Sequence, residues 1–99
     1  MREQIAELQK LIRAIDDKFR AIPERPLGEK DAYEERRNDI RKVAGELLKE
    51  HGFAFREQWD GSAVRALGIR STCAAGLKGA FLNWRAAAER KIEQLRGAQ

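Results

Sequence analysis

The sequence predicts an all-α protein, in which residues 1–52 form an N-terminal antiparallel helical hairpin and residues 53–99 a C-terminal helical segment packed on it. Two observations favour this fold class. The 99 residues are rich in Ala, Glu, Arg, Lys and Leu, which lose little on entering a helix. Apolar residues also recur with helical spacing in three segments, and no alternating strand pattern extends past about four positions. A chain of this length forms a single domain with a thin core.

The first helix is expected from about Glu3 to Ala21. Its apolar residues are separated alternately by three and four positions, which is the a/d pattern of a coiled coil. They are Ile5, Leu8, Ile12, Ile15, Phe19 and Ile22. Pro23 ends the helix, because a proline disfavours the α conformation in the residue before it. The Ile5–Ile22 stripe can pack against the second helix, or it can form a homodimer with the same stripe of a second copy.

A connector from about Pro23 to Gly28 leads to the second helix, expected from about Glu29 to His51. Its apolar stripe is weaker, because Arg36 and Arg37 stand where a heptad would place an apolar residue. Gly52 predicts the end of this helix, with the glycine in the left-handed conformation. A short connector between two long amphipathic helices favours an antiparallel hairpin.

The C-terminal half is expected to hold an aromatic loop, a short helix and a long helix. The segment Phe53–Trp59 is interpreted as a loop or turn that covers the core, and Ser62 as the N-cap of a short helix from Ala63 to Leu67. The last helix is expected from about Cys73 to Arg96. Gly76 and Gly79 near its start indicate a close approach of another backbone or a ligand. The expected aromatic core consists of Phe53, Phe55, Trp59, Phe81 and Trp84.

Composition argues against several classes of protein. The single cysteine, Cys73, allows no intrachain disulfide, and the N-terminus has no signal-peptide pattern, so we expect a cytoplasmic protein. No apolar run approaches the length of about 20 residues that spans a membrane. One His and one Cys make a metal site improbable, and a nucleophilic pair of Cys73 and His51 is disfavoured because each has an ordinary place near a helix end. We expect no enzyme and no cofactor.

The net charge of +4 lies entirely in the second half of the chain. Residues 1–50 hold 12 basic and 12 acidic residues, whereas residues 51–99 hold 8 basic and 4 acidic residues. Such asymmetry is typical of a chain whose basic half meets a charged partner. The partner can be nucleic acid or an acidic protein surface, and an ordinary solubilising charge is the alternative.

Residues 63–78 resemble a helix-turn-helix segment. Ala66-Leu67-Gly68-Ile69 is similar to the end of the first helix and the turn, and Arg70-Ser71-Thr72 with Leu77-Lys78 is similar to a recognition helix. One residue is missing after Ile69 relative to the common spacing, and an ordinary helical corner is the alternative. The resemblance implies that DNA would meet Arg70, Ser71, Thr72 and Lys78, with Arg65 and Arg85 near phosphates.

The function expected from the sequence is that of a non-enzymatic regulatory or adaptor protein which binds a macromolecule through its basic C-terminal half. A protein partner is the first expectation and nucleic acid the second. The alternative is a small inhibitor from a phage or mobile element, similar to anti-CRISPR proteins, that blocks a larger host complex by protein contact. It rests on size and charge by analogy. The candidate partner-binding residues are Arg65, Arg70, Ser71, Thr72, Lys78 and Arg85.

Overall fold

The structure is a computed structural model that describes residues 2–23 and 31–97. Two helices, α1 (Arg2–Arg20) and α2 (Ala32–His51), precede a sheet of three strands and a last helix, α3 (Leu77–Gly97). The strands are β1 (Ala54–Gln58), β2 (Gly61–Ala66) and β3 (Ile69–Cys73). The prediction of an all-α fold is therefore wrong, because the segment expected to hold a loop and a short helix forms a sheet. Most of the expected connector from Pro23 to Gly28 lies outside the described residues.

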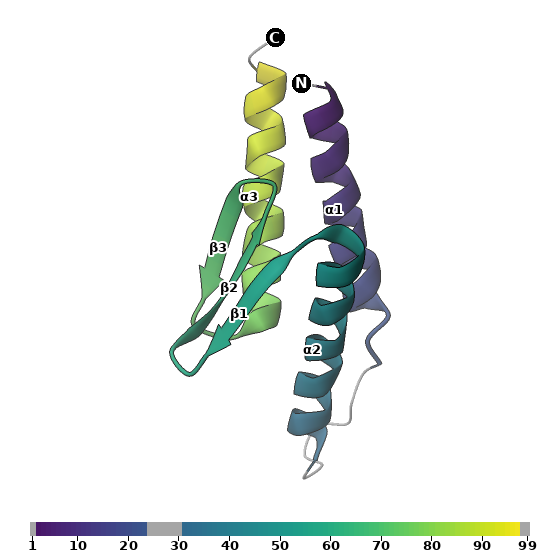
Figure 1. Cartoon of the computed structure of the whole chain (residues 1–99), viewed down its shortest axis with the longest axis vertical. Helices are drawn as coiled ribbons and strands as arrows, with labels where there is room; N and C mark the ends of the chain where they lie inside the picture. Colours follow the sequence, from purple (N-terminus) through teal and green to yellow (C-terminus); the bar gives the residue numbers. More distant parts are fainter. Residues whose placement is uncertain (1, 24–30, 98–99) are drawn as a thin grey trace.

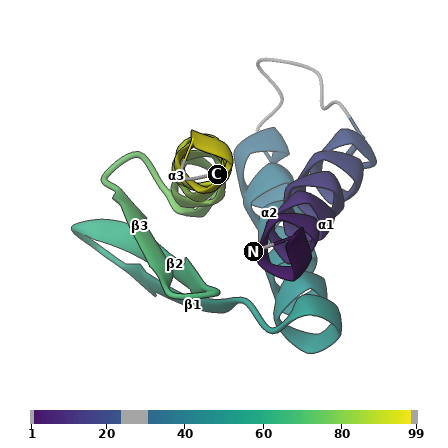
Figure 2. The same ribbon diagram turned by 90° about the horizontal axis from the view of Figure 1, so that it is seen from above.

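The three helices and the sheet form layers around α3. Helix α2 runs antiparallel to α1, and α3 has the sheet on one side and the α1–α2 pair on the other (Figures 1 and 2). The strands are consecutive antiparallel neighbours in the order β1-β2-β3. Within the described part of the chain, no helix combines the length and the apolar character that crossing a membrane requires.

Both strand connections are two-residue turns. Trp59 and Asp60 join β1 to β2, and Leu67 and Gly68 join β2 to β3. Leu67 has φ 50° and Gly68 has φ 77°. Positive φ at both central residues matches the right-handed twist of paired strands, and it explains why the chain reverses into a hairpin here. The short helix predicted from Ala63 to Leu67 is therefore absent, and Ser62 is a buried strand residue instead of an N-cap.

The helix-turn-helix interpretation is also wrong. Residues 63–78 contain most of β2, the Leu67-Gly68 turn, all of β3 and the first residues of α3. Helix α3 begins at Leu77 instead of Cys73. Near its start, a Cβ on Gly79 would lie 2.5 Å from the Sγ of Cys73, so the close approach expected at this glycine is a contact with the end of β3.

The core lies where α3 meets both the sheet and the two N-terminal helices. The rings of Phe53 and Trp84 are 4.9 Å apart between centroids, and those of Phe53 and Phe81 are 5.5 Å apart. The indole Nε1 of Trp84 donates to the carbonyl oxygens of Ala66 and Ile69, each at 3.2 Å, which fastens the β2–β3 turn to α3. The predicted aromatic core is wrong in one member: Trp59 is 97% exposed.

The apolar stripe of α1 packs inside this core. Three of its residues, Leu8, Ile12 and Ile15, are buried against the rest of the chain, together with the neighbouring Leu11. Because the fold itself covers this surface, we do not propose a homodimer through it. The end of α2 agrees with its prediction, since Gly52 is left-handed with φ 74° and its N–H donates to the carbonyl of Leu48.

Candidate functional site

The candidate site is the face of the sheet that points away from the helices. Side chains alternate between the two faces of a strand. Val64 and Ala66 of β2 are buried beneath α3, as is Ser62. The positions between them point outward, together with their cross-strand partners on β1 and β3. We call this surface the outer face, and its residues are Ala54, Arg56, Gln58, Ala63, Arg65, Arg70 and Thr72.

Arg56, Arg65 and Arg70 give the outer face a strong positive charge. All three are exposed, and Arg65 stands directly opposite Arg70 in the register of β2 and β3. Among the described residues, none of the three makes an ion pair or a side-chain hydrogen bond. Like charges placed opposite each other destabilise a sheet slightly. These arginines therefore give the outer face a positive charge that no interaction within the described chain neutralises.

The carboxylate that the strands carry points away from the outer face. Glu57 is the acidic residue of β1, and it lies on the inner side of the sheet, opposite Ser62. The Nε of Arg41 on α2 donates to the Oε1 of Glu57 at 2.9 Å, and the terminal nitrogen Nη2 of Arg41 lies 2.7 Å from the same oxygen. Arg41 holds the pKa of the Glu57 carboxyl below its ordinary value, mainly through this hydrogen bond. The charge of Glu57 is thus used within the fold and does not neutralise the outer face.

A hollow of about 310 Å³ lies on the outer face. Its floor includes Gly61 and Ala63 of the central strand, and Arg56 and Arg70 line it from the neighbouring strands. Small residues between long basic ones leave room for a group of atoms to approach the sheet between the guanidinium groups. Asp60, in the β1–β2 turn, is the acidic residue of the lining. The Nδ2 of Asn83 on α3 donates to the carbonyl of Thr72 at 2.8 Å and holds the β3 side of the hollow.

The structure brings together half of the residues proposed from the sequence. Arg65, Arg70 and Thr72 share the outer face. Ser71 points to the opposite face and is half-buried, and Lys78 is half-buried in the first turn of α3. Sequence reasoning missed Arg56, because its place opposite Ala63 depends on recognising the β1–β2 hairpin.

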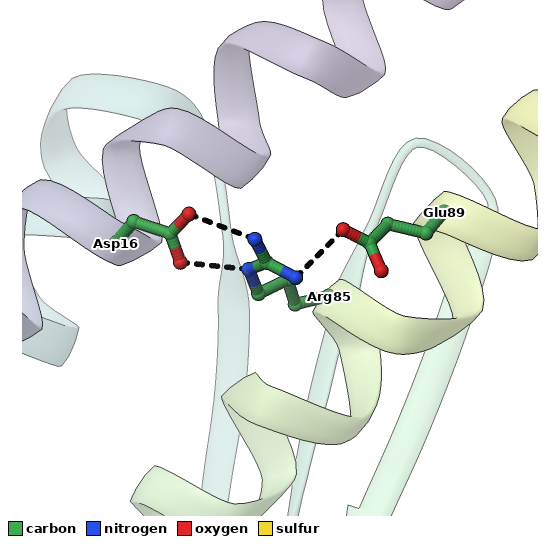
Figure 3. A network of polar contacts seen from close by, with 3 residues as sticks. All are labelled: Asp16, Arg85 and Glu89. Atoms are coloured by element: carbon green, nitrogen blue, oxygen red, sulfur yellow. Dashed lines mark hydrogen bonds and ion pairs between the residues drawn. The ribbon is translucent and has the colours of Figure 1, made fainter.

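Arg85 has a different environment from the one predicted. Its Nε donates to Oδ1 of Asp16 at 2.7 Å, its second terminal nitrogen to Oδ2 at 3.0 Å, and its first to Glu89 at 2.7 Å (Figure 3). This two-pronged hydrogen bond lowers the pKa of Asp16 and raises the pKa of Arg85. Because Asp16 is on α1 and Arg85 on α3, the pair links two helices, and its guanidinium is not free for a partner.

The surroundings of Arg85 form a second hollow region, of about 750 Å³, between α1 and α3. We call it the α1–α3 groove. Whereas the strand positions of the outer face carry no carboxylate, acidic and basic side chains alternate through this groove. Its lining residues include Gln9, Arg13, Asp16, Arg85, Glu89, Arg90, Glu93 and Arg96.

The described residues hold no group of three or more His, Cys, Asp or Glu side chains that could bind a metal ion. Cys73 is half-buried against Gly79. Comparisons with protein-family models, curated proteins and solved structures gave no match to this chain. The outer face therefore carries the candidate function.

Proposed function

We propose that this protein is a non-enzymatic, cytoplasmic nucleic-acid-binding protein that contacts the phosphate backbone with the outer face of its sheet. One observation carries the proposal: Arg56, Arg65 and Arg70 are exposed on one face whose strand positions hold no carboxylate. A guanidinium presents N–H donors in a planar fork that matches the oxygens of a phosphate. Strands are also an established means of presenting such residues to nucleic acid.

Nucleic acid fits this face better than an acidic protein surface does. Stable protein interfaces depend on large apolar or aromatic anchors that become buried at their centre. The apolar strand residues of the outer face are Ala54 and Ala63, which offer very little area for such an anchor, and the exposed Trp59 lies beside them in the β1–β2 turn and not at the centre of the face. A phosphate backbone needs no apolar anchor, because release of bound counterions drives the association. The balance of charge and apolar area therefore supports nucleic acid as the partner that we propose.

The test is the salt dependence of binding to a fluorescently labelled oligonucleotide mixture, measured by anisotropy. Each phosphate contact contributes about −0.7 to −0.9 to the slope of log K against log salt concentration. Three arginine contacts predict a slope of about −2 to −3 by that rule. Replacing one of them with Gln, as in Arg56→Gln, Arg65→Gln or Arg70→Gln, should reduce the slope by one contact and weaken binding to every sequence alike.

Arg13→Gln and Arg90→Gln are the matched controls. Both remove one exposed arginine and change the net charge by the same amount, but they lie in the α1–α3 groove. If net charge alone drove binding, all five variants would behave identically and the outer face would lose its special role. If the wild-type chain bound no nucleic acid even at low salt, the proposal would fail. The partner to test next would then be an acidic protein surface, which this chain would bind as a small inhibitor of a larger complex.

A further inference from the structure

We infer that the outer face takes single-stranded nucleic acid, with the indole of Trp59 stacked on a base while the arginines hold the neighbouring phosphates. This inference rests on the proposed function and specifies its ligand. The fold does not account for the exposure of Trp59. Trp59 is 97% exposed, the most exposed of the large apolar side chains in the described residues.

Neither burial nor turn geometry accounts for a tryptophan at this position. Trp59 and Asp60 are the central residues of a two-residue connection closed by the pairing of Gln58 with Gly61. Neither Trp59 nor Asp60 has a positive φ, so this turn accepts a tryptophan but does not call for one in the way that positive-φ turns call for Gly, Asn or Asp. Full exposure of an indole gains none of the free energy that burial of its apolar surface would supply. Trp59 is thus free to contact a ligand.

The position of Trp59 joins it to the arginines. The β1–β2 turn forms the end of the sheet far from the junction of α2 with β1 (Figure 1). The residues on either side of Trp59, Gln58 and Asp60, both line the hollow that Arg56 and Arg70 share. A strand lying along the outer face would therefore meet Arg65 and Arg70 near one end, Arg56 in the middle, and the β1–β2 turn that carries Trp59 at the other end. A combination of basic groove and aromatic platform is how proteins bind single strands.

The width of the sheet also favours a single strand over a duplex. Adjacent strands lie about 4.8 Å apart, so the backbones of β1 and β3 are separated by roughly 10 Å before side chains are added. The major groove of B-DNA, about 12 Å wide, admits a helix or a two-stranded ribbon. A three-stranded face that carries arginine on every strand is too broad to enter it. Within a duplex, moreover, no base face would be free to stack on Trp59.

The experiment compares three probes of equal length and end label: single-stranded oligothymidine, the same phosphate backbone with abasic sites, and a hairpin duplex. We expect oligothymidine to bind about tenfold more tightly than the abasic strand, as one stacked base contributes. Oligothymidine should also quench the fluorescence of Trp59. The second tryptophan, Trp84, is fully buried and should not respond. Trp59→Phe should therefore lose the quenching.

Trp59→Ala should lower the affinity for oligothymidine about tenfold and leave the abasic strand unaffected, since stacking alone is removed. Tyr33→Ala is the control, because Tyr33 is another aromatic side chain that is 74% exposed, on α2. Equal affinity for oligothymidine and the abasic strand, or tighter binding of the duplex, would overturn the inference while the proposed function stands. Failure of all three probes to bind would overturn the proposed function itself. Melting curves of both variants verify that they fold.

Discussion

Arginine occurs both on the outer face of the sheet and in the α1–α3 groove, but its surroundings differ. In the groove, Arg85 is held by Asp16 across the helix interface and by Glu89 on its own helix. On the outer face, Arg65 stands opposite another arginine, and the strands' carboxylate, Glu57, lies on the other side of the sheet. The groove satisfies the charge of Arg85 internally and thereby supports the fold. The outer face leaves its charges for something outside the chain.

The largest expected effect comes from reversing the charge of the outer face. Arg56→Glu combined with Arg65→Glu removes two phosphate contacts and adds two repulsive charges. Charged hydrogen bonds contribute about 1.5–3 kcal/mol each, so nucleic-acid affinity should fall by at least about 100-fold. Stability should stay equal or rise by about 0.2–1 kcal/mol, because the carboxylate introduced at position 65 would face Arg70 as an opposite charge. Anisotropy and urea unfolding measure the two effects. A matching loss of stability would mean that these arginines serve the fold.

Trp84→Phe should affect the stability of the fold and not the affinity for nucleic acid. It removes the N–H that serves the carbonyls of Ala66 and Ile69 beneath the outer face. Loss of these two hydrogen bonds, together with the space vacated by the smaller ring, should cost about 2–3 kcal/mol of unfolding free energy. Urea unfolding checks this, with Trp59→Phe as the exposed control expected to stay within about 0.5 kcal/mol of the wild type. Equal effects of the two variants would contradict the burial of Trp84.

Arg85→Gln should destabilise the fold by about 1 kcal/mol without weakening nucleic-acid binding. The reason is the two-pronged bond to Asp16, whose strength is limited because both side chains are 31% exposed. Arg90→Gln in the same groove is the control, since Arg90 has no ion-pair partner among the described residues. Chemical unfolding and anisotropy of both variants give the readings. A binding defect specific to Arg85→Gln would move the functional surface toward the groove.

The smallest expected effect is a dependence of stability on pH. Arg85 lowers the pKa of Asp16 in the folded state below its ordinary value, mainly through their hydrogen bonds. Stabilisation by this carboxylate is therefore complete above the ordinary pKa of about 4 and is lost as the pH falls through the lower, folded-state pKa. Asp16→Asn should flatten this part of the curve of unfolding free energy against pH, whereas Asp17→Asn, an exposed neighbour on α1, should not. Identical curves for both variants would show that the ion pair does not stabilise the fold.

The helices were predictable because their signal is local. The i, i+3 and i+4 spacing of Leu8, Ile12 and Ile15 brings apolar side chains to one face of α1 by helix geometry alone. The stop at Gly52 is equally local, since it depends on the left-handed conformation of a single glycine. The sheet gave a much weaker signal. The inward positions of β2 are Ser62, Val64 and Ala66, and two of these are too small or too polar to produce a clear alternation.

The candidate site depended on that weaker signal. Arg65, Arg70 and Thr72 were proposed as part of a helix-turn-helix, yet they share a surface because strand side chains alternate with a period of two. Their neighbour Arg56 was missed because it joins them only through the pairing of β1 with β2. Trp59 was assigned to the core on its apolar character, whereas its place in a turn leaves it outside.

The sequence by itself determined the three long helices, the apolar face of α1, the end of α2 and the basic character of the second half. Each depends on residues close together in the chain, through helix periodicity or composition. Only the tertiary structure decided that residues 54–73 form a sheet, that Arg85 is neutralised by Asp16, and that three arginines share an exposed face. These features depend on contacts between distant residues, above all the packing of the sheet against α3, and no local pattern specifies them.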